Sequence, residues 1–248
     1  MSDDSDSSRG ARHGAIKALC RTLKLPTVAR EFVQTERVAL SEAWAPGEYL
    51  HTLLDAEVAT RVEHAVARRL RAARLPAPKT LAQFDWRRAH GVERPRIENL
   101  ARCEWVSTAR NVVLLGPVGT GKTHLAIALT MAAIGRGHGA LFFRASDLVR
   151  TLTEARDARQ LSRLHDRLQR VDVLVVDELG FVPFERSGGG LLFDVLSTRH
   201  ERRAIVMTSN LSFGEWNRVF GDDKLTAALL DRLAQHAEVI VTRGAGCK

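Results

Sequence analysis

The stretch VVLLGPVGTGKT, residues 112–123, decides the fold of this chain. An apolar run, predicted to form a strand over 111–115, leads into a glycine-rich loop, and the apolar positions after the loop predict a helix over 122–135. The segment GPVGTGKT matches the phosphate-binding pattern G-x-x-x-x-G-K-S/T at every fixed position. We therefore expect a P-loop that binds a nucleoside triphosphate together with Mg²⁺.

The residue types of this loop suit a polyphosphate. Its glycines let backbone N–H groups approach phosphate oxygens closely, and the positive end of the following helix dipole adds to the attraction. Lys122 is expected to reach the β- and γ-phosphates, and the Thr123 hydroxyl to ligate Mg²⁺. A glycine-rich turn without function is the alternative, which the flanking strand and helix make weaker. The expected nucleotide-binding residues are Gly116, Pro117, Val118, Gly119, Thr120, Gly121, Lys122, Thr123 and His124.

A second apolar run, VDVLVVDE at 171–178, predicts a strand buried on both faces of a parallel sheet. It ends in two carboxylates, at the sheet edge where ligands of open α/β sheets bind. We expect Asp177 to hold the magnesium ion, largely through water, and Glu178 to polarise a water molecule for attack on the γ-phosphate. An exposed Asp-Glu turn would be the better interpretation of these residues alone, but the P-loop upstream favours the catalytic one.

A third apolar run, AIVMTSN at 204–210, predicts another buried strand that ends in polar residues. Asn210 is a candidate to hold the attacking water or to contact the γ-phosphate. It can also serve as a helix N-cap for the segment that begins at Ser212. The sequence leaves both roles open.

From residue 111 onward, apolar runs and helical patterns alternate along the chain. The expected strands span 111–115, 140–144, 172–177, 204–209 and 237–242. Single helices are expected over 122–135, 188–202, 212–220 and 224–236, and more than one helix over 146–170. Alternation of this kind gives a parallel sheet with helices on both faces, so the predicted fold class is α/β with a parallel five-stranded core sheet.

The front of the chain shows helical patterns and no strand pattern. The helices expected there and before the first strand lie near 12–24, 26–40, 46–74 and 93–108. Prolines after the third helix mark a linker. The expected boundaries are 1–10 for a disordered tail, 11–75 for a small all-α domain, 76–92 for the linker and 93–248 for the domain that holds the P-loop.

A net charge of +8 favours a polyanionic partner. Arginine strongly outnumbers lysine, however, and a GC-rich coding bias would produce this without any ligand. The arginine-rich stretches are 61–74 and 144–170. On the predicted helices of both stretches the arginines lie apart from the apolar stripe, where they either grip a phosphate backbone or face solvent.

Cys20, Cys103 and Cys247 are scattered, and the nine histidines show no metal-ligand spacing, so neither a disulfide framework nor a zinc site is indicated. No apolar run approaches the length of a membrane span, and the acidic, serine-rich start MSDDSDSSRG is unlike a signal peptide. We expect a cytoplasmic protein without a membrane partner.

Together these stretches resemble the AAA+ ATPases, and within them the helicase loaders of the DnaC type and the IstB-like transposition helpers. The matching stretches are LLGPVGTGKTHLAIALT, VLVVDELGFVPF, IVMTSNLSFGEW, LTAALLDRLAQHAEVI, LKLPTVAREF and LLDAEVATRVEHAVARRLRAARLPAPKTLAQFDW. IstB-like proteins are encoded beside a DDE-type transposase, bind ATP and assemble on duplex DNA. The resemblance therefore implies ATP, Mg²⁺, double-stranded DNA, a DDE-type transposase and a homo-oligomer with ATP at subunit interfaces.

Carried over onto matching positions, Gly116–Thr123 are the Walker A motif, Asp177 and Glu178 the Walker B motif, and Asn210 the sensor 1 residue. Arg232, in LLDRL, matches the position of an arginine finger, which completes the ATP site of a neighbouring subunit. The alternative is that Arg232 is a surface arginine on an amphipathic helix. The implied catalytic residues are Lys122, Asp177, Glu178, Asn210 and Arg232, and the implied metal ligands are Thr123 and Asp177.

The resemblance also implies what surrounds this site. Because the sequence stops shortly after the last predicted strand, we expect an AAA+ domain without a C-terminal helical lid, and slow hydrolysis. The alternative function is a DnaC-like loader of a replicative helicase, which the ATPase motifs do not distinguish from a transposition helper. A small-molecule kinase is a third function, but Glu178 and Asn210 favour water as the phosphate acceptor.

Overall fold

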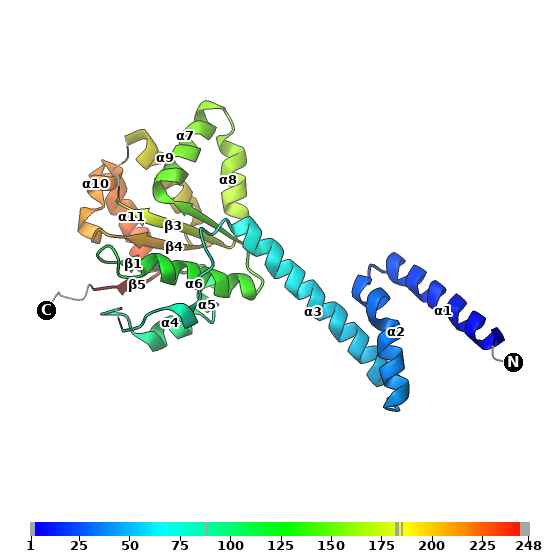
Figure 1. The fold of residues 1–248 in the computed structure, drawn as a ribbon. Helices are drawn as coiled ribbons and strands as arrows, with labels where there is room; N and C mark the ends of the chain where they lie inside the picture. Colours follow the sequence, from blue (N-terminus) through cyan, green and yellow to red (C-terminus); the bar gives the residue numbers. More distant parts are fainter. Residues whose placement is uncertain (1–2, 88, 182–183, 185, 244–248) are drawn as a thin grey trace. The chain divides into compact units, whose positions relative to one another are not determined.

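The computed structural model describes residues 3–87, 89–181, 184 and 186–243 (Figure 1). The chain forms two compact units, Met1–Ala67 and Arg68–Lys248. The sequence placed this boundary near residue 75. In the structure, the end of the third helix and the segment after it belong to the larger unit. Among the described residues, no helix is both long enough and apolar enough to cross a membrane.

The smaller unit consists of α1 (Asp3–Thr22), α2 (Pro26–Ser41) and the first part of α3 (Pro46–Ala73). Its buried apolar core is made of Cys20, Val28, Phe32 and Leu53. α1 begins at Asp3, whereas the sequence predicted a disordered tail up to residue 10. Extending an existing helix fixes few dihedral angles for each hydrogen bond gained, so a helix nucleated further along can continue into this stretch.

A buried carboxylate on α3 holds the start of α2. Glu57 accepts hydrogen bonds from the backbone N–H groups of Thr27 at 2.7 Å and Val28 at 3.1 Å. A helix start leaves such N–H groups without an intrahelical acceptor. Arg61 donates to the other carboxylate oxygen at 2.9 Å. Burial alone would raise the pKa of Glu57, but these hydrogen bonds outweigh burial and lower the pKa below its ordinary value.

Replacing Glu57 with alanine is expected to destabilise the smaller unit by about 1–3 kcal/mol, because two backbone N–H groups lose their acceptor. Since the folded-state pKa lies below the ordinary value of 4.5, the carboxylate stabilises fully above that pH and loses its effect as the pH falls through the lowered pKa. Hydrogen exchange of the α2 amides, at neutral and at acidic pH, measures both losses. The matched control is Glu63→Ala, an exposed glutamate of α3; equal exchange in the two variants would contradict the capping role.

The larger unit is built on a five-stranded parallel sheet, as predicted from the sequence. Its strands are β1 (Asn111–Leu115), β2 (Ala140–Arg144), β3 (Val173–Leu179), β4 (Ala204–Ser209) and β5 (Ala237–Val241). They lie in the order β2-β3-β4-β1-β5, and every neighbouring pair is parallel. Leu115 at the end of β1 and Leu179 at the end of β3 both pair with Ser209 of β4, so the carboxyl ends of these strands meet at one edge. The predicted α/β fold class is confirmed.

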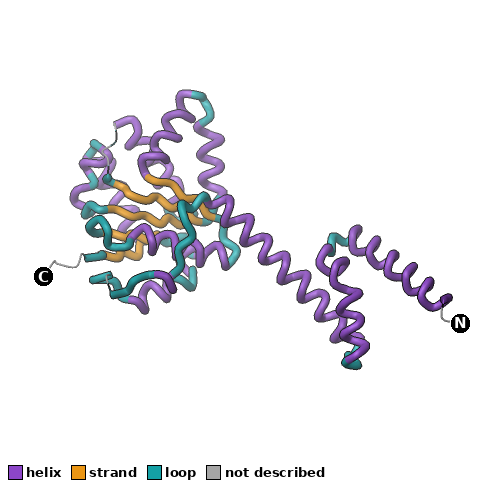
Figure 2. Tube along the Cα trace, viewed as in Figure 1, coloured by secondary structure: helices purple, strands orange, loops and turns teal. Residues whose placement is uncertain are grey.

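Helices cover both faces of the sheet (Figure 2). On one face lies α6 (Lys122–Gly135). On the other, α7 (Ala145–Asp157), α8 (Leu161–Arg170), α9 (Arg186–Arg199), α10 (Asn217–Phe220) and α11 (Asp223–Gln235) share one apolar core with the strands. The remaining described pieces are short: η1 (Leu81–Gln83), α4 (Arg94–Leu100), α5 (Glu104–Ser107) and η2 (Phe213–Glu215).

One predicted helix is interrupted in the structure. The helix expected near 93–108 is divided into α4 and α5 at Cys103, which has φ 64°. The region 146–170, where more than one helix was expected, consists of α7 and α8, with Arg159 between them at φ 56°. A left-handed residue ends an α-helix. Cys103 is not the glycine that usually signals such a break, which is why the periodicity of the sequence did not show this one.

A buried arginine joins several elements at the sheet edge opposite the P-loop. Arg199, the last residue of α9, donates hydrogen bonds to the backbone carbonyl groups of Leu168, Val171, Asp172 and Ala204. These carbonyls belong to α8 and to the residues at the starts of β3 and β4. Burial lowers the pKa of Arg199 to about 9, so the guanidinium remains charged at neutral pH.

Candidate functional site

The loop between β1 and α6 needs glycine for steric reasons. Gly116 has φ 138°, and a Cβ there would lie 2.1 Å from the backbone oxygen of Thr242, directly after β5. Gly121, the N-cap of α6, has φ 87°, and a Cβ there would lie 2.7 Å from the ring of Phe84. The hydroxyl groups of Thr120 and Thr242 are hydrogen-bonded at 2.6 Å. Both ends of the loop are therefore packed against segments distant in the sequence.

Lys122 is the first residue of α6, and its side chain turns back into the loop. Its Nζ donates hydrogen bonds to the backbone oxygens of Gly116 at 2.6 Å and Pro117 at 2.7 Å. Burial lowers the pKa of Lys122, and the negative charges of Asp177 and Glu178 partly oppose that shift. The ammonium group is thus held among backbone oxygens within the electrostatic reach of both carboxylates.

The two carboxylates at the end of β3 have different surroundings. Asp177 is buried, and its Oδ1 accepts hydrogen bonds from the hydroxyl groups of Thr123 at 3.0 Å and Thr208 at 2.6 Å. Glu178 is exposed and has φ 60°, next to a register shift between β3 and β4. Its backbone N–H donates to the Thr208 hydroxyl at 2.9 Å, and its carboxylate lies 3.7 Å from the Nε of Arg144. Left-handed non-glycine residues cost energy and are common at functional sites.

Asn210 lies directly after β4, and its Oδ1 is buried without a hydrogen-bond partner among the described residues. Burying such an acceptor costs free energy unless a ligand or a water molecule donates a hydrogen bond to it. The alternative that Asn210 caps the segment from Ser212 is wrong, because Ser212 is itself the N-cap of η2 and shares a capping box with Glu215.

A pocket of about 370 Å³ unites these elements. It is lined by Lys79, Val118, Gly119, Gly121, Lys122, Thr123, His124, Glu178, Phe181, Thr208 and Asn210. The structure therefore brings the P-loop, the end of β3 and the end of β4 to one cavity. Asp177 adjoins it through its hydrogen bond to Thr123.

Sequence reasoning missed two contributions to this pocket. One is Thr208, whose hydroxyl joins Asp177 to the backbone of Glu178; a polar residue near the end of an apolar strand was the available signal. The other is the segment predicted to be a linker. Lys79 lines the pocket, and the backbone oxygen of Thr80 is 2.8 Å from the Nε2 of His124. No local pattern places this segment against the loop.

Arg232 lies apart from the other predicted catalytic residues. It is exposed on α11, with its guanidinium carbon 6.0 Å from the ring centroid of Phe193 on α9. It is not among the residues that line the pocket. The structure thus does not bring it to the site of its own chain.

The strand order, the loop between β1 and α6, and the Asp-Glu pair after β3 define a P-loop NTPase with the AAA+ fold. The model of the IstB-like ATP binding protein family matches residues 18–248, and the chain belongs to this family of ATP-binding proteins.

Curated relatives agree with this membership. An "Insertion sequence IS21 putative ATP-binding protein" of Pseudomonas aeruginosa is 40% identical over 197 residues, which cover 79% of this chain and 74% of the relative. An "Insertion sequence IS5376 putative ATP-binding protein" of Geobacillus stearothermophilus is 34% identical over 229 residues, which cover 92% of this chain and 91% of the relative.

Solved structures show the same fold at low sequence identity. The crystal structure of DnaI has a TM-score of 0.56 at 21% identity and covers 66% of this chain and 90% of that chain. AMPPCP-bound DnaA from Aquifex aeolicus has a TM-score of 0.55 at 23% identity and covers 67% of this chain and 51% of that chain.

Proposed function

We propose that this protein is an ATPase of DNA transposition that assembles on double-stranded DNA in an ATP-dependent manner and recruits or stimulates a partner DDE-type transposase. The observation that carries the ATPase part of the proposal is the pocket that joins Lys122, Glu178 and Asn210 to the P-loop. The names of the insertion-sequence relatives support the transposition context.

The residues of the loop are suited to hold ATP. Lys122 would exchange its contacts with two backbone oxygens for the stronger charge of the β- and γ-phosphates. The backbone N–H groups from Gly116 to Thr123 would donate to the phosphate oxygens. His124 and Lys79 lie on the same pocket and would contact the remainder of the nucleotide.

The donor set beside the loop fits Mg²⁺. The Thr123 hydroxyl and the Asp177 carboxylate are hard oxygen ligands that already meet at 3.0 Å, and this ion prefers such ligands. Thr208 would keep Asp177 oriented through its 2.6 Å hydrogen bond. When bound, the ion supplies charge neutralisation on the phosphates.

The polar residues on the open side of the pocket are suited to hydrolysis. Glu178 would accept a proton from the attacking water, and the unpartnered Oδ1 of Asn210 would accept a hydrogen bond from that water and so orient it. Arg232, which lies outside the pocket of its own chain, would contribute its positive charge to the site of a neighbouring copy. ATP at such interfaces makes turnover depend on assembly.

Two arginine-lined hollows along β2 are suited to bind the DNA backbone. β2 is the edge strand of the sheet. One hollow, of about 270 Å³, is formed by residues 139–141 together with Arg69, Arg167 and Arg170. The other, of about 390 Å³, is formed around Phe142 and Phe143 with Arg74, Arg144 and Arg150. The ion pairs among the described residues occupy Arg144 and Arg150 but leave the other four arginines without an acidic partner.

Replacing Arg69, Arg167 and Arg170 together with alanine is expected to weaken duplex binding in the presence of ATP. The slope of log affinity against log salt concentration should become shallower by about 0.9 for each phosphate that the protein no longer neutralises. Fluorescence anisotropy of a labelled duplex over a salt series measures both quantities, and ATP affinity should stay unchanged.

The matched control removes the same charge elsewhere. Arg102, Arg110 and Arg202 are exposed and lie outside both hollows, so their replacement by alanine should change the affinity less and keep the salt slope closer to that of the unaltered protein. Equal weakening in the two triple variants would assign the effect to net charge. If the affinity of the unaltered protein for duplex DNA did not change with salt concentration, that result would contradict the DNA-binding proposal itself.

A further inference from the structure

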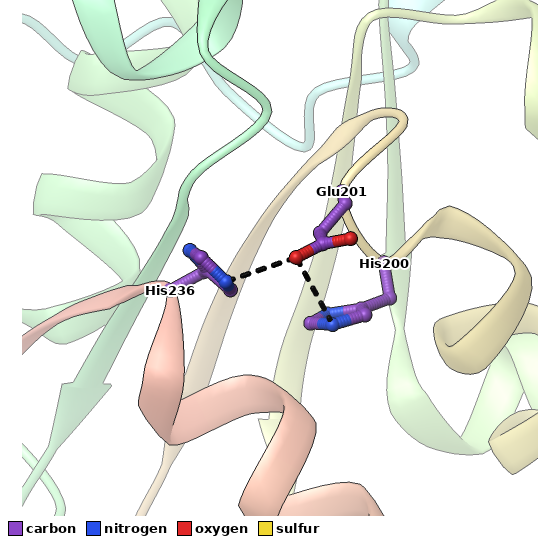
Figure 3. Close-up of side chains that lie close together, drawn as sticks. All are labelled: His200, Glu201 and His236. Atoms are coloured by element: carbon purple, nitrogen blue, oxygen red, sulfur yellow. Dashed lines mark ion pairs between the residues drawn. The ribbon is translucent and has the colours of Figure 1, made fainter.

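The turn after α9 and the junction between α11 and β5 bring three metal-ligating side chains together (Figure 3). His200 and Glu201 follow the last residue of α9, and His236 lies between α11 and β5. The carboxylate of Glu201 lies between the two imidazole rings in Figure 3. The three ligand atoms all lie within 4.8 Å of one another.

We propose that His200, Glu201 and His236 form a binding site for a divalent transition-metal ion, with Zn²⁺ as the ion that the donor set fits best. Two imidazole nitrogens and one carboxylate oxygen are a combination that binds zinc with a further position left for water. This site lies apart from the P-loop pocket, and no residue is shared between them.

The distances are close to those that a tetrahedral ion requires. With metal–ligand bonds of about 2.0–2.1 Å, the ligand atoms would be roughly 3.3 Å apart. The Oε1 of Glu201 is 3.0 Å from the Nε2 of His236 and 3.9 Å from the Nε2 of His200. The ring centroids of the two histidines are 5.6 Å apart, with their planes tilted by 58°. To close this set around one ion, the Nε2 of His200 would have to move closer to the Glu201 carboxylate.

The ring of His200 is partly buried and lies too far from Glu201 for a hydrogen bond. The side chain of His200 is only 20% exposed, and its Nδ1 is buried without a hydrogen-bond partner among the described residues. Its Nε2 lies 3.9 Å from Glu201, beyond hydrogen-bond distance. Coordination of Nε2 would replace this long ion pair with a direct bond to the ion, whereas the buried Nδ1 would gain no partner from it.

The exposure of Glu201 and His236 determines whether water can reach the bound ion. The side chains of Glu201 and His236 are 62% and 43% exposed, so water has access for the remaining coordination position. Metal affinity at such a site depends on three protein ligands rather than a closed set of four. A bound ion would join the end of α9 to the end of α11 and would thereby stabilise both.

Titration calorimetry of tag-free full-length protein with ZnCl₂ tests the proposal. The expected result is binding of one ion, with affinity at least about ten-fold weaker in His200→Ala and in His236→Ala. Zinc should raise the Tm of the unaltered protein and not that of the two variants. His64→Ala, an exposed histidine on α3, is the matched control and should bind zinc as the unaltered protein does.

Co²⁺ absorption provides a measurement that would not change if the three residues had only a structural role. Co²⁺ bound by these ligands should give the visible absorption bands of a tetrahedral site, and Glu201→Gln should weaken or shift them. ATP affinity should be equal in all variants, which separates failure of this site from failure of the nucleotide site. Absence of zinc binding, or zinc affinity in the two histidine variants equal to that of the unaltered protein, would overturn the proposal and leave Glu201 as an ordinary ion-pair partner of His236.

Discussion

Glu178→Gln should lower steady-state ATP hydrolysis by about 10²- to 10⁴-fold while leaving ATP affinity nearly unchanged. The amide keeps the size and most hydrogen-bonding positions of the side chain but cannot accept the proton of the attacking water, and a general base contributes a rate factor of this size. Release of inorganic phosphate measures hydrolysis, and equilibrium binding of a labelled ATP measures affinity. We also expect the variant to stay on duplex DNA in its ATP-bound form for longer.

Glu98→Gln is the matched control for this experiment. Glu98 is 52% exposed and ion-paired to Arg94, which resembles the 47% exposure of Glu178 and its pairing with Arg144. Replacing it should leave hydrolysis at the rate of the unaltered protein. If Glu178→Gln hydrolysed ATP at that same rate, the assignment of the base would fail, although the nucleotide pocket would stand.

Lys122→Ala should reduce ATP affinity by at least about 30-fold, which corresponds to a loss of at least about 2 kcal/mol of binding free energy. The reason is that the phosphates would enter a partly buried loop without the cation that neutralises them. Isothermal titration with ATP and Mg²⁺ measures the loss, and sedimentation with duplex DNA tests the accompanying loss of nucleotide-dependent assembly.

Lys224→Ala controls for the removal of a lysine charge, because Lys224 is exposed and lies outside the nucleotide pocket. Circular dichroism of both variants establishes that each is folded. A Lys122→Ala protein that bound ATP and assembled as the unaltered protein does would remove the basis of the proposed function.

The sheet was predictable because its central strands β1, β3 and β4 are buried almost throughout and appear in the sequence as apolar runs. The P-loop was predictable for a different reason, since its glycines, lysine and threonine all lie within one segment of eight residues, 116–123. Positions set by distant packing were not predictable in this way. The left-handed conformation of Cys103 is an example: it divides a helix and has no signature in the local sequence.

The candidate site shows the same division. Lys122, Glu178 and Asn210 follow strands whose ends the topology brings together, so their convergence could be expected. Contacts of Thr80 with His124, and of Phe84 with Gly121, depend on how a segment before the sheet folds back over the loop. His200 and His236 approach only because two helices end beside each other, which their separation in the sequence conceals.

The contact of Gly116 and Thr120 with Thr242 has a consequence for biosynthesis. The threonine pair joins positions 122 residues apart, and it closes the loop from the side of β5. A ribosome translates β1 and the phosphate-binding loop long before it reaches β5. A nascent chain that has reached α11 therefore still lacks the residue that supports this loop from behind, and we expect the loop to take its final conformation only after residue 242 has left the exit tunnel.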